Sequence, residues 1–405
     1  MKILYAVHGY KPAYKIGGPI ISVSAAAEVL VKKGHKVTVF TTNSNLTEDL
    51  DVLVDQPTDV NGVEVWYFKR EEPLKKYLPF ISYLSKSIGF LYAPKMRSAL
   101  DLLLPKVDIV HTHLPFIYPT YAAGNAAIRH GKPLFYSQRG VFDPERLKFR
   151  SWKKHLYISL VEKSLLKRAT TLISLTEAEI ASYRALGVNT PIEVIPNGIT
   201  VEDYWQELPE DWNERIGIDR NAQVILFMGR LHPIKGVNLL IKAFLSIKEM
   251  FPKAVLVLAG PDDFGLKDKF RDEIKAAPGV SNVIFSGMIT GDMKKALLTR
   301  ADIFCLPSDA EGFSIAVLEA MASKTAVLIS PGCHFPSVES AYAGKIIPPS
   351  VDNLALALST LLTDKKCLKV MGENGYHLVK TEYNWDRIIN MLISVYNEGI
   401  SRKKQ

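Results

Sequence analysis

The sequence predicts an α/β protein with two Rossmann-like domains that face each other across a cleft, each with a parallel sheet covered by helices on both faces. Three observations predict this fold. The chain has 405 residues, more than one domain usually contains. Short β-branched runs alternate with helical patterns along almost the whole chain, as in βαβ units. This alternation breaks once, between residues 195 and 221, where proline, glycine, tryptophan and acidic residues interrupt every periodicity.

The individual elements follow the chain in order. Residues 1–8 are typical of a buried first strand and contain too little apolar length for a secretory signal. Further buried strands are predicted at 36–40, 108–111, 171–174, 224–227, 254–258, 283–285 and 326–329. Helices are predicted between them, among others at 22–33, 237–250 and 316–322. Ligands of such parallel sheets bind beyond the carboxyl ends of the strands, so we expect the chemistry in the loops that follow them.

The composition favours some partners and excludes others. The formal net charge of +8 favours anionic partners such as nucleotide diphosphates, nucleic acid or an anionic membrane surface. No recognition helix or RNA-binding motif accompanies the charge, so we do not expect nucleic-acid binding. Cys305, Cys333 and Cys367 are widely spaced, which indicates packed thiols rather than a disulfide framework or a zinc site. No run of about 18 apolar residues predicts a membrane span, and a cytoplasmic location is expected.

The strongest chemical signal is the segment 311–319, EGFSIAVLE. A helix is predicted to begin near Ser314, so Glu311 lies just before it and Glu319 about one and a half turns inside it. Backbone N–H groups at Ser314 and Ile315 suit a phosphate or sugar hydroxyls. The two carboxylates suit sugar hydroxyls and a ribose diol. Alternatively, Glu311 is only a charge near a helix N-terminus and Glu319 a solvated residue of the helix face.

A second segment, 227–236, reads FMGRLHPIKG and lies between a predicted strand and a predicted helix. Gly229 permits a tight exit from the strand. Arg230 and Lys235 then supply two cations at the point where the strand ends. A guanidinium fork and an ammonium group together suit a diphosphate leaving group. Alternatively, both residues are exposed loop cations.

Two adjacent glycines, Gly17 and Gly18, lie between the first predicted strand and the first predicted helix. Glycine allows backbone N–H groups to approach a phosphate closely. Most glycine pairs are merely turns, so this signal is weak by itself. The G-x-G-x-x-G spacing of a dinucleotide site is absent, which argues against NAD as a cofactor.

Two patterns raise the question of a metal site. His111 and His113 point to the same face of a predicted strand, but no third ligand is evident nearby, and a packed strand-end histidine is a common alternative. Asp49 and Asp51 fit the D-x-D pattern of metal-dependent transferases. They lie among polar residues, and we interpret them as part of a solvated loop. We therefore expect no metal site.

Together these segments resemble the family 4 retaining glycosyltransferases of the GT-B fold. Segment 311–319 matches the family's E-x7-E motif, and segment 229–236 matches its G-R-L-x-x-x-K-G motif. Segment 195–199, IPNGI, resembles a motif near the family's interdomain linker, and segment 111–113 resembles its H-x-H strand end. The resemblance spans the whole chain and is specific mainly between residues 195 and 322.

The resemblance implies transfer of a hexosyl group from a UDP- or GDP-linked sugar to a hydroxyl of a glycan or of a polyprenyl-diphosphate-linked acceptor, with retention and without a metal ion or other cofactor. The leaving phosphate takes the proton of the acceptor, and the protein chiefly stabilises that phosphate. The implied catalytic residues are His113, Arg230, Lys235 and Glu311. The implied donor-binding residues are Gly17, Gly18, Arg230, Lys235, Ser314, Ile315 and Glu319.

Each implied residue has a role in this scheme. Arg230, Lys235 and the Gly18 backbone stabilise the phosphate. Glu311 holds the hydroxyls of the sugar, and Glu319 holds the ribose. The N–H groups near Ser314 and Ile315 hold the sugar or the phosphate, and His113 lies near the transferred sugar.

The resemblance also implies the domain roles. Residues 1–200 form the acceptor-side domain, and a last helix within 384–405 packs back onto it. Residues 201–383 form the domain that binds the nucleotide sugar. Two positions depart from the family pattern. Ser314 stands where glycine is usual, which bears on the approach of the backbone to the sugar, and Arg139 stands where histidine is common, which bears on the acceptor.

Two stretches of the first domain combine cations with apolar residues. Segment 75–97 contains many aromatic and aliphatic residues among lysines, and segment 146–168 carries eight cationic residues. An apolar helix face surrounded by lysines is typical of peripheral membrane binding. The alternative is ordinary helices that pack on their own domain with a solvated basic rim. We favour contact with the inner face of an anionic membrane, which suits a lipid-linked acceptor.

Two other functions compete with transfer. A sugar-nucleotide epimerase on the same architecture acts on the donor alone, and analysis of the products separates it from a transferase. A non-catalytic subunit keeps the nucleotide cleft and only binds. A site that has lost its activity need not retain all of its charged residues. This argues against a non-catalytic subunit, because the chain contains Glu311, Glu319, Arg230 and Lys235 together.

Overall fold

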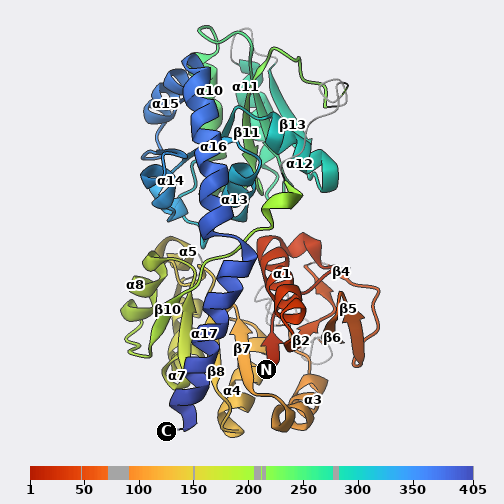
Figure 1. The fold of residues 1–405 in the computed structure, drawn as a ribbon. Helices are drawn as coiled ribbons and strands as arrows, with labels where there is room; N and C mark the ends of the chain where they lie inside the picture. Colours follow the sequence, from red (N-terminus) through yellow and green to blue (C-terminus); the bar gives the residue numbers. More distant parts are fainter. Residues whose placement is uncertain are drawn as a thin grey trace. The chain divides into compact units, whose positions relative to one another are not determined.

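The computed structural model describes residues 1–46, 48–71, 91–148, 151–204, 211, 216–276 and 282–404 (Figure 1). The chain forms two compact units. Unit 1 consists of Met1–Asn197 and Trp385–Gln405, and unit 2 of Gly198–Asn384. Each unit has an α/β architecture with a mainly or wholly parallel sheet, so the predicted fold class is confirmed.

The sheet of unit 1 has eight strands among the described residues, in the order β10-β9-β8-β7-β1-β2-β6-β5. Their bounds are β1 Lys2–Ala6, β2 Lys36–Thr42, β5 Pro57–Val60, β6 Val63–Phe68, β7 Ile109–His113, β8 Leu134–Ser137, β9 Thr171–Ser174 and β10 Ile192–Val194. All neighbours pair in parallel except β5 and β6. The central strands β1, β7 and β8 are almost entirely buried, as expected where helices cover both faces.

The helices of unit 1 pack against both faces of this sheet. They include α1 Gly18–Lys32, α3 Lys95–Leu103, α4 Tyr118–Arg129, α5 Pro144–Lys148, α6 Ser151–Tyr157, α7 Lys163–Arg168, α8 Glu177–Ala185 and α17 Trp385–Lys404. The last helix, α17, lies beside α1 (Figure 1). Its apolar side, from Trp385 to Tyr396, belongs to the same core cluster as Tyr5 and Phe135 of the sheet. The final helix is therefore an integral part of unit 1.

The sheet of unit 2 is wholly parallel, with the order β13-β12-β11-β14-β15-β16. Its strands are β11 Gln223–Met228, β12 Ala254–Ala259, β13 Val283–Gly287, β14 Ile303–Leu306, β15 Ala326–Ile329 and β16 Gly344–Ile346. Its main helices are α10 Val237–Ile247, α11 Leu266–Ala276, α12 Gly291–Arg300, α13 Ile315–Ala322, α15 Val351–Thr363 and α16 Lys365–Glu382. The strand order reverses between β11 and β14, and such a switch point is where open α/β sheets bind ligands.

The chain passes between the units twice, after Asn197 and after Asn384. The two passages lie next to each other on the side of unit 2, because the Ile199 N–H donates to the Tyr383 carbonyl at 2.8 Å and Ile199 bridges to Asn384. The sequence prediction sets these boundaries after residues 200 and 383.

Two local features differ from the predictions. Helix α1 begins at Gly18 rather than near residue 22, because Pro19 suits the first turn of a helix. Asp49 is 51% exposed, as predicted for a solvated residue, but it does not lie in a loop. It belongs to the two-residue strand β4, Glu48–Asp49, and its Oδ1 accepts a hydrogen bond from Arg70 Nε at 2.5 Å. Asp49 is therefore the partner of an arginine.

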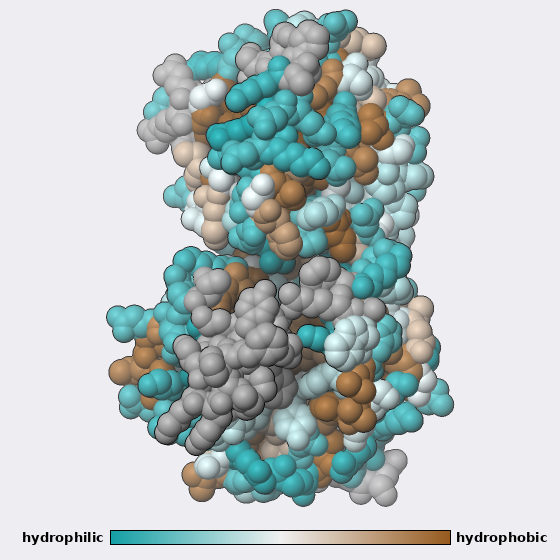
Figure 2. Space-filling model, turned by 180° about the vertical axis from the view of Figure 1, so that it is seen from behind, coloured by the Kyte–Doolittle hydropathy of each residue, from teal (hydrophilic) through white to brown (hydrophobic). Residues whose placement is uncertain are grey.

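No helix in the described part of the chain has the length and apolar character that crossing a membrane requires. Figure 2 shows that the face of unit 2 seen from behind is largely hydrophilic, with hydrophobic residues in small separate patches. Scattered apolar residues of this kind are normal on a protein surface.

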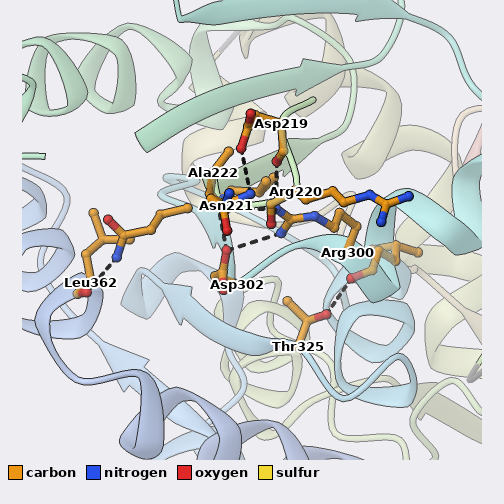
Figure 3. Close-up of polar contacts among 11 residues, drawn as sticks. Asp219, Arg220, Asn221, Ala222, Arg300, Asp302, Thr325 and Leu362 are labelled. Carbon is orange, nitrogen blue, oxygen red and sulfur yellow. Dashed lines mark hydrogen bonds and ion pairs between the residues drawn. The ribbon is translucent and has the colours of Figure 1, made fainter. Parts of the chain in front are cut away.

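One arginine ties together the loop before β11 and the end of α12 (Figure 3). The Arg300 side chain is only 12% exposed, and its Nη1 lies 3.5 Å from Asp302 Oδ2. Its Nη2 donates to three backbone carbonyls, those of Asp219, Arg220 and Ala222, at 3.2, 3.3 and 2.8 Å. Asp302 Oδ2 in turn accepts from the Val224 N–H at 2.7 Å. A single guanidinium therefore satisfies several backbone groups at the start of the sheet of unit 2.

Replacing Arg300 by leucine is expected to lower the free energy of unfolding by about 2–4 kcal/mol, because three backbone carbonyls and Asp302 lose the hydrogen bonds of a side chain that is only 12% exposed. Urea denaturation of the full chain measures this change. Arg271→Leu is the control, since Arg271 is 51% exposed and lies 3.6 Å from an exposed Asp268. The control is expected to cost less than about 1 kcal/mol. Equal losses in both variants would contradict the assigned role of Arg300.

Candidate active site

The predicted residues of unit 2 lie in the two loops that follow β11 and β14, on either side of the switch point, and in helix α13, which follows the second of these loops. Close backbone contacts fix these loops. A Cβ on Gly236, which has φ +68°, would lie 2.1 Å from the Pro307 carbonyl oxygen. A Cβ on Gly332 would lie 2.3 Å from the Asp309 carbonyl oxygen. The loop after β14 is therefore held between the two segments that carry these glycines. A larger residue at either glycine would displace the backbone of this loop.

Lys235 and Glu311 come from these two loops and form an ion pair between Lys235 Nζ and Glu311 Oε1. The Lys235 side chain is 19% exposed and the Glu311 side chain 8%. The Glu311 N–H also donates to the Gly332 carbonyl at 2.8 Å, which fixes the backbone at this position. Glu311 is therefore a buried, paired carboxylate rather than a free charge near a helix end.

Arg230 lies in the same loop as Lys235, and its side chain is exposed. The loop is attached to the next strand, because the Gly229 N–H donates to the Ala259 carbonyl at 2.8 Å. A Cβ on Gly260 would lie 1.9 Å from the Gly229 carbonyl oxygen, so the backbones pack tightly here. The position of Arg230 is therefore fixed at its backbone, and its guanidinium is accessible to a ligand.

Ser314 is the N-cap residue of α13, and Ile315 is its first helical residue. The Ser314 side chain makes no capping hydrogen bond and is buried. The first N–H groups of a helix have no partner within the helix, and they attract anions and hydroxyl oxygens. The N-terminus of α13 therefore offers donors close in sequence to Glu311.

Glu319 lies inside α13 and is only 2% exposed. Its Oε1 accepts from Lys294 Nζ at 2.6 Å and from the Tyr204 hydroxyl at 2.9 Å. Burial, followed by the neighbouring Glu319 charge, raises the pKa of Tyr204, so its hydroxyl stays protonated and donates. The alternative of a solvated helix-face residue is therefore wrong.

In unit 1, Gly17 and Gly18 lie at the N-terminus of the 15-residue helix α1. Gly17 has φ +99°, which favours glycine, and an added Cβ on either residue would meet no atom within 4 Å. The space in front of this helix end is therefore open to a ligand. The helix then runs past Ser22, whose hydroxyl accepts a hydrogen bond from Arg139 Nη1 at 3.0 Å.

His113 ends strand β7 and is 2% exposed. Arg139 Nε lies 3.3 Å from His113 Nδ1. A guanidinium only donates, so Nδ1 accepts and the proton of the neutral ring lies on Nε2. Burial, with the charges of His111 and Arg139, holds the pKa of His113 well below its usual range. Within the described residues Nε2 has no partner, so it is a buried donor that lacks an acceptor.

His111 is engaged differently, although it lies on the same strand. Its Nδ1 contacts the Tyr396 hydroxyl at 2.6 Å, and its Nε2 contacts Ser137 Oγ at 2.8 Å. Both ring nitrogens are therefore used within the core. In the ranges that the structure describes, no group of three or more His, Cys, Asp or Glu side chains is placed to hold a metal ion.

Sequence reasoning missed several residues that contact the predicted ones. Tyr204 and Lys294 hold Glu319, and Ser22 and Asn197 accept from Arg139. Ser22 lies one turn after Gly18 on a predicted helix, which is a usable signal. Asn197 lies in the IPNGI segment, whose resemblance to a linker motif does not indicate a contact with Arg139. Nothing in the local sequence indicates that Lys294 and Tyr204 meet.

Two family models match successive parts of the chain. The model described as Glycosyltransferase Family 4 matches residues 16–203, and the one described as Glycosyl transferases group 1 matches residues 209–378. An uncharacterised glycosyltransferase of Methanocaldococcus jannaschii is 28% identical over 98% of both chains. A UDP-Gal:alpha-D-GlcNAc-diphosphoundecaprenol alpha-1,3-galactosyltransferase of Escherichia coli is 26% identical over 88% of this chain and 93% of its own.

Solved structures with similar folds include a sucrose-phosphate synthase of Thermosynechococcus elongatus, with a TM-score of 0.76 and 20% identity over 99% of both chains. Another is Anabaena HepE in complex with UDP and glucose, with a TM-score of 0.74 and 18% identity over 98% of this chain and 100% of that one. These likenesses support the GT-B fold. With family matches in both halves, the chain belongs to the GT-B glycosyltransferases, with a Glycosyltransferase Family 4 segment followed by a Glycosyl transferases group 1 segment.

Proposed function

We propose that this glycosyltransferase moves a hexosyl group from a UDP- or GDP-linked sugar to a hydroxyl of a glycan or polyprenyl-diphosphate-linked acceptor, with retention and without a metal ion. The observation that carries the proposal is the meeting of Lys235 and Glu311 at the switch point of unit 2, beside Arg230 and the N-terminus of α13. Cations, a carboxylate and free N–H groups are the donors and acceptors that a sugar diphosphate requires.

In the proposed reaction the bond between the sugar C1 and the diphosphate oxygen breaks, and the acceptor oxygen bonds to C1 from the same face. The proton of the acceptor hydroxyl moves to the departing phosphate. Arg230 and Lys235 stabilise the charge that develops on that phosphate, with backbone N–H groups of Gly17 and Gly18 as further donors. No carboxylate of the protein attacks the sugar.

The remaining residues bind and orient the substrate. Glu311, paired with Lys235, accepts from hydroxyls of the sugar, and Glu319 accepts from the ribose. The N–H groups at Ser314 and Ile315 bind the sugar or the phosphate. His113 lies near the transferred sugar. Its buried Nε2–H has no acceptor among the described residues and can donate a hydrogen bond to a ligand oxygen.

The named relatives support this class of substrate. The Escherichia coli relative is named for UDP-Gal and a diphosphoundecaprenol-linked acceptor. A relative from Corynebacterium urealyticum, named D-inositol 3-phosphate glycosyltransferase, is 26% identical over 94% of this chain and 90% of its own. By analogy, donors and acceptors of these kinds are the first to test.

A thermal-shift panel of UDP, GDP, ADP and their sugar conjugates tests the donor part of the proposal. A bound ligand at about 100 times its dissociation constant is expected to stabilise the chain by roughly 2.7 kcal/mol. One nucleotide diphosphate should raise Tm equally with and without EDTA. If no nucleotide raises Tm, the donor assignment is wrong, and if EDTA abolishes the rise, metal independence is wrong.

The stereochemical part is tested by NMR of the transfer product. Retention predicts that the new glycosidic bond has the same anomeric configuration as the donor. An inverted product would contradict the proposed same-face reaction. Conversion of the donor to an epimer without any acceptor would instead favour the epimerase.

We further propose that unit 1 contacts the inner face of an anionic membrane. Of the two stretches that suggested it, segment 75–97 lies outside the described residues as far as residue 90. The other contains Trp152, Leu156 and Leu160, which are 68%, 51% and 71% exposed and recur every four residues. The same stretch of sequence also contains the cations Lys148, Lys153, Lys154, Lys163, Lys167 and Arg168. Exposed apolar side chains among cations suit an anionic lipid surface.

Trp152→Ser with Leu160→Ser is expected to weaken binding to phosphatidylglycerol vesicles by about tenfold, because two interfacial apolar side chains are lost. Vesicle co-sedimentation at low salt measures this. Leu102→Ser is the control, since Leu102 is 74% exposed on α3 and lies outside the stretch. Failure of the unsubstituted protein to bind these vesicles would argue against membrane contact.

A further inference from the structure

Arg139 presents a positive charge that the structure leaves without a counter-ion. In the described part of the chain, its hydrogen bonds go to three neutral groups, namely His113 Nδ1 at 3.3 Å, Ser22 Oγ at 3.0 Å and Asn197 Oδ1 at 3.2 Å. Nε and Nη1 make these bonds, so Nη2 keeps its donors for another partner. Among the described residues, no ion pair includes Arg139.

The carboxylate that acts electrostatically on Arg139 compensates its charge poorly. Glu179 interacts electrostatically with the guanidinium, but burial raises the pKa of its carboxyl to about 7. Its Oε2 is also engaged by the Leu175 N–H at 2.8 Å. Arg139 itself stays charged at neutral pH, because burial lowers its pKa only to about 10. A partly buried cation without a full counter-charge is costly unless a ligand supplies one.

The surroundings of Arg139 add donors rather than acceptors. Arg139 and His113 line one cavity of unit 1 together with Asn197. The buried Nε2–H of His113 has no partner among the described residues. Ser22, which binds Arg139, lies in the first turns of α1, whose N-terminus carries a partial positive charge. Arg139 also has φ +55°, a conformation that non-glycine residues rarely adopt.

We propose that Arg139 and His113 form a binding site for an oxyanion, a phosphate or carboxylate group carried by the acceptor. Arg139 Nη2 and His113 Nε2 donate to its oxygens, and Ser22 and Asn197 hold the guanidinium in place. The inference rests on the proposed function, in which Arg230 and Lys235 neutralise the charge of the donor diphosphate. A neutral acceptor would leave the Arg139 charge without a partner, so the glycosylated molecule carries an anionic group near the reacting hydroxyl.

Inorganic phosphate and acetate are the probes, titrated against sodium chloride at the same ionic strength and followed by thermal shift. At least one of them should raise Tm of the unsubstituted protein and of Lys235→Ala. Arg139→Gln should weaken that response at least tenfold, and Arg139→Lys should retain part of it. A larger rise in Tm with phosphate would indicate a phosphate-bearing acceptor, and a larger rise with acetate would indicate a carboxylate-bearing one. An equal response in Arg139→Gln would overturn the proposal.

A second titration separates the acceptor from the donor. Binding of the nucleoside diphosphate should change less than threefold in Arg139→Gln, whereas a tenfold loss would assign Arg139 to the donor and overturn the proposal. If Arg139→Gln does not fold, the imidazole ¹⁵N signals of His113 in the unsubstituted protein test whether the anion binds at this site. They are expected to shift when the anion is added, and a constant signal would overturn the site. Neither readout requires transfer activity, so failure of the proposed reaction remains distinguishable from failure of this site.

Discussion

Replacing Lys235 by alanine is expected to lower kcat/KM by about 10²–10³-fold, because a positioned donor to the developing phosphate charge is lost. The rigid loop supports this magnitude. Gly236 packs directly on the Pro307 carbonyl, which fixes the backbone next to Lys235. Steady-state kinetics with the donor found in the thermal-shift panel measure the loss. Lys242→Ala is the matched control, since Lys242 lies on α10 with a 51% exposed side chain.

The same substitution also affects stability, and the two effects must be separated. Without Lys235, the 8% exposed Glu311 side chain loses its cation, and unfolding becomes easier. The double variant Lys235→Met with Glu311→Gln removes both charges. It should recover most of the lost stability and none of the lost activity. Recovery of activity in the double variant, or unchanged kcat/KM in Lys235→Ala, would contradict the role of Lys235 at the phosphate.

Much of the fold could be predicted because it depends on local patterns. Apolar, β-branched runs such as 224–227 and 254–258 have the length and composition of buried parallel strands, and both became strands of unit 2. The loops after such strands converge at one edge of the sheet. For that reason the sequence also predicts that residues as far apart as Lys235 and Glu311 lie near each other, and they form an ion pair.

The contacts that tune the site could not be predicted in this way. Lys294 on α12 and Tyr204 near the first passage between the units meet at one oxygen of Glu319, and no periodicity relates these three positions. Arg139 was recognised only as a departure from a family pattern. Its significance depends on which neighbours accept its hydrogen bonds, and these come from distant segments. Side-chain partners of this kind are set by tertiary packing rather than by local sequence.

Substituting Glu319 by glutamine is expected to weaken binding of the nucleoside diphosphate by about 10–100-fold, because hydrogen bonds to a charged group contribute roughly 1.5–3 kcal/mol. Oε1 already accepts from Lys294 and Tyr204, which leaves Oε2 to accept from a ribose hydroxyl. Isothermal titration with the ribonucleotide measures the loss. Glu373→Gln is the control, because Glu373 forms a 3.1 Å ion pair with Lys324 while its side chain is 49% exposed.

A second ligand distinguishes a ribose contact from a general disturbance of unit 2. In the unsubstituted protein, the 2′-deoxynucleotide should bind more weakly than the ribonucleotide. In Glu319→Gln this difference should shrink, because the carboxylate that accepts from the 2′-hydroxyl is gone. The coupling energy between the substitution and the loss of the 2′-hydroxyl measures the contact between Glu319 and the ribose. If the difference persists unchanged, Glu319 does not hold the ribose. It then acts only as the buried partner of Lys294 and Tyr204, and Lys294→Met should reproduce its effect on stability.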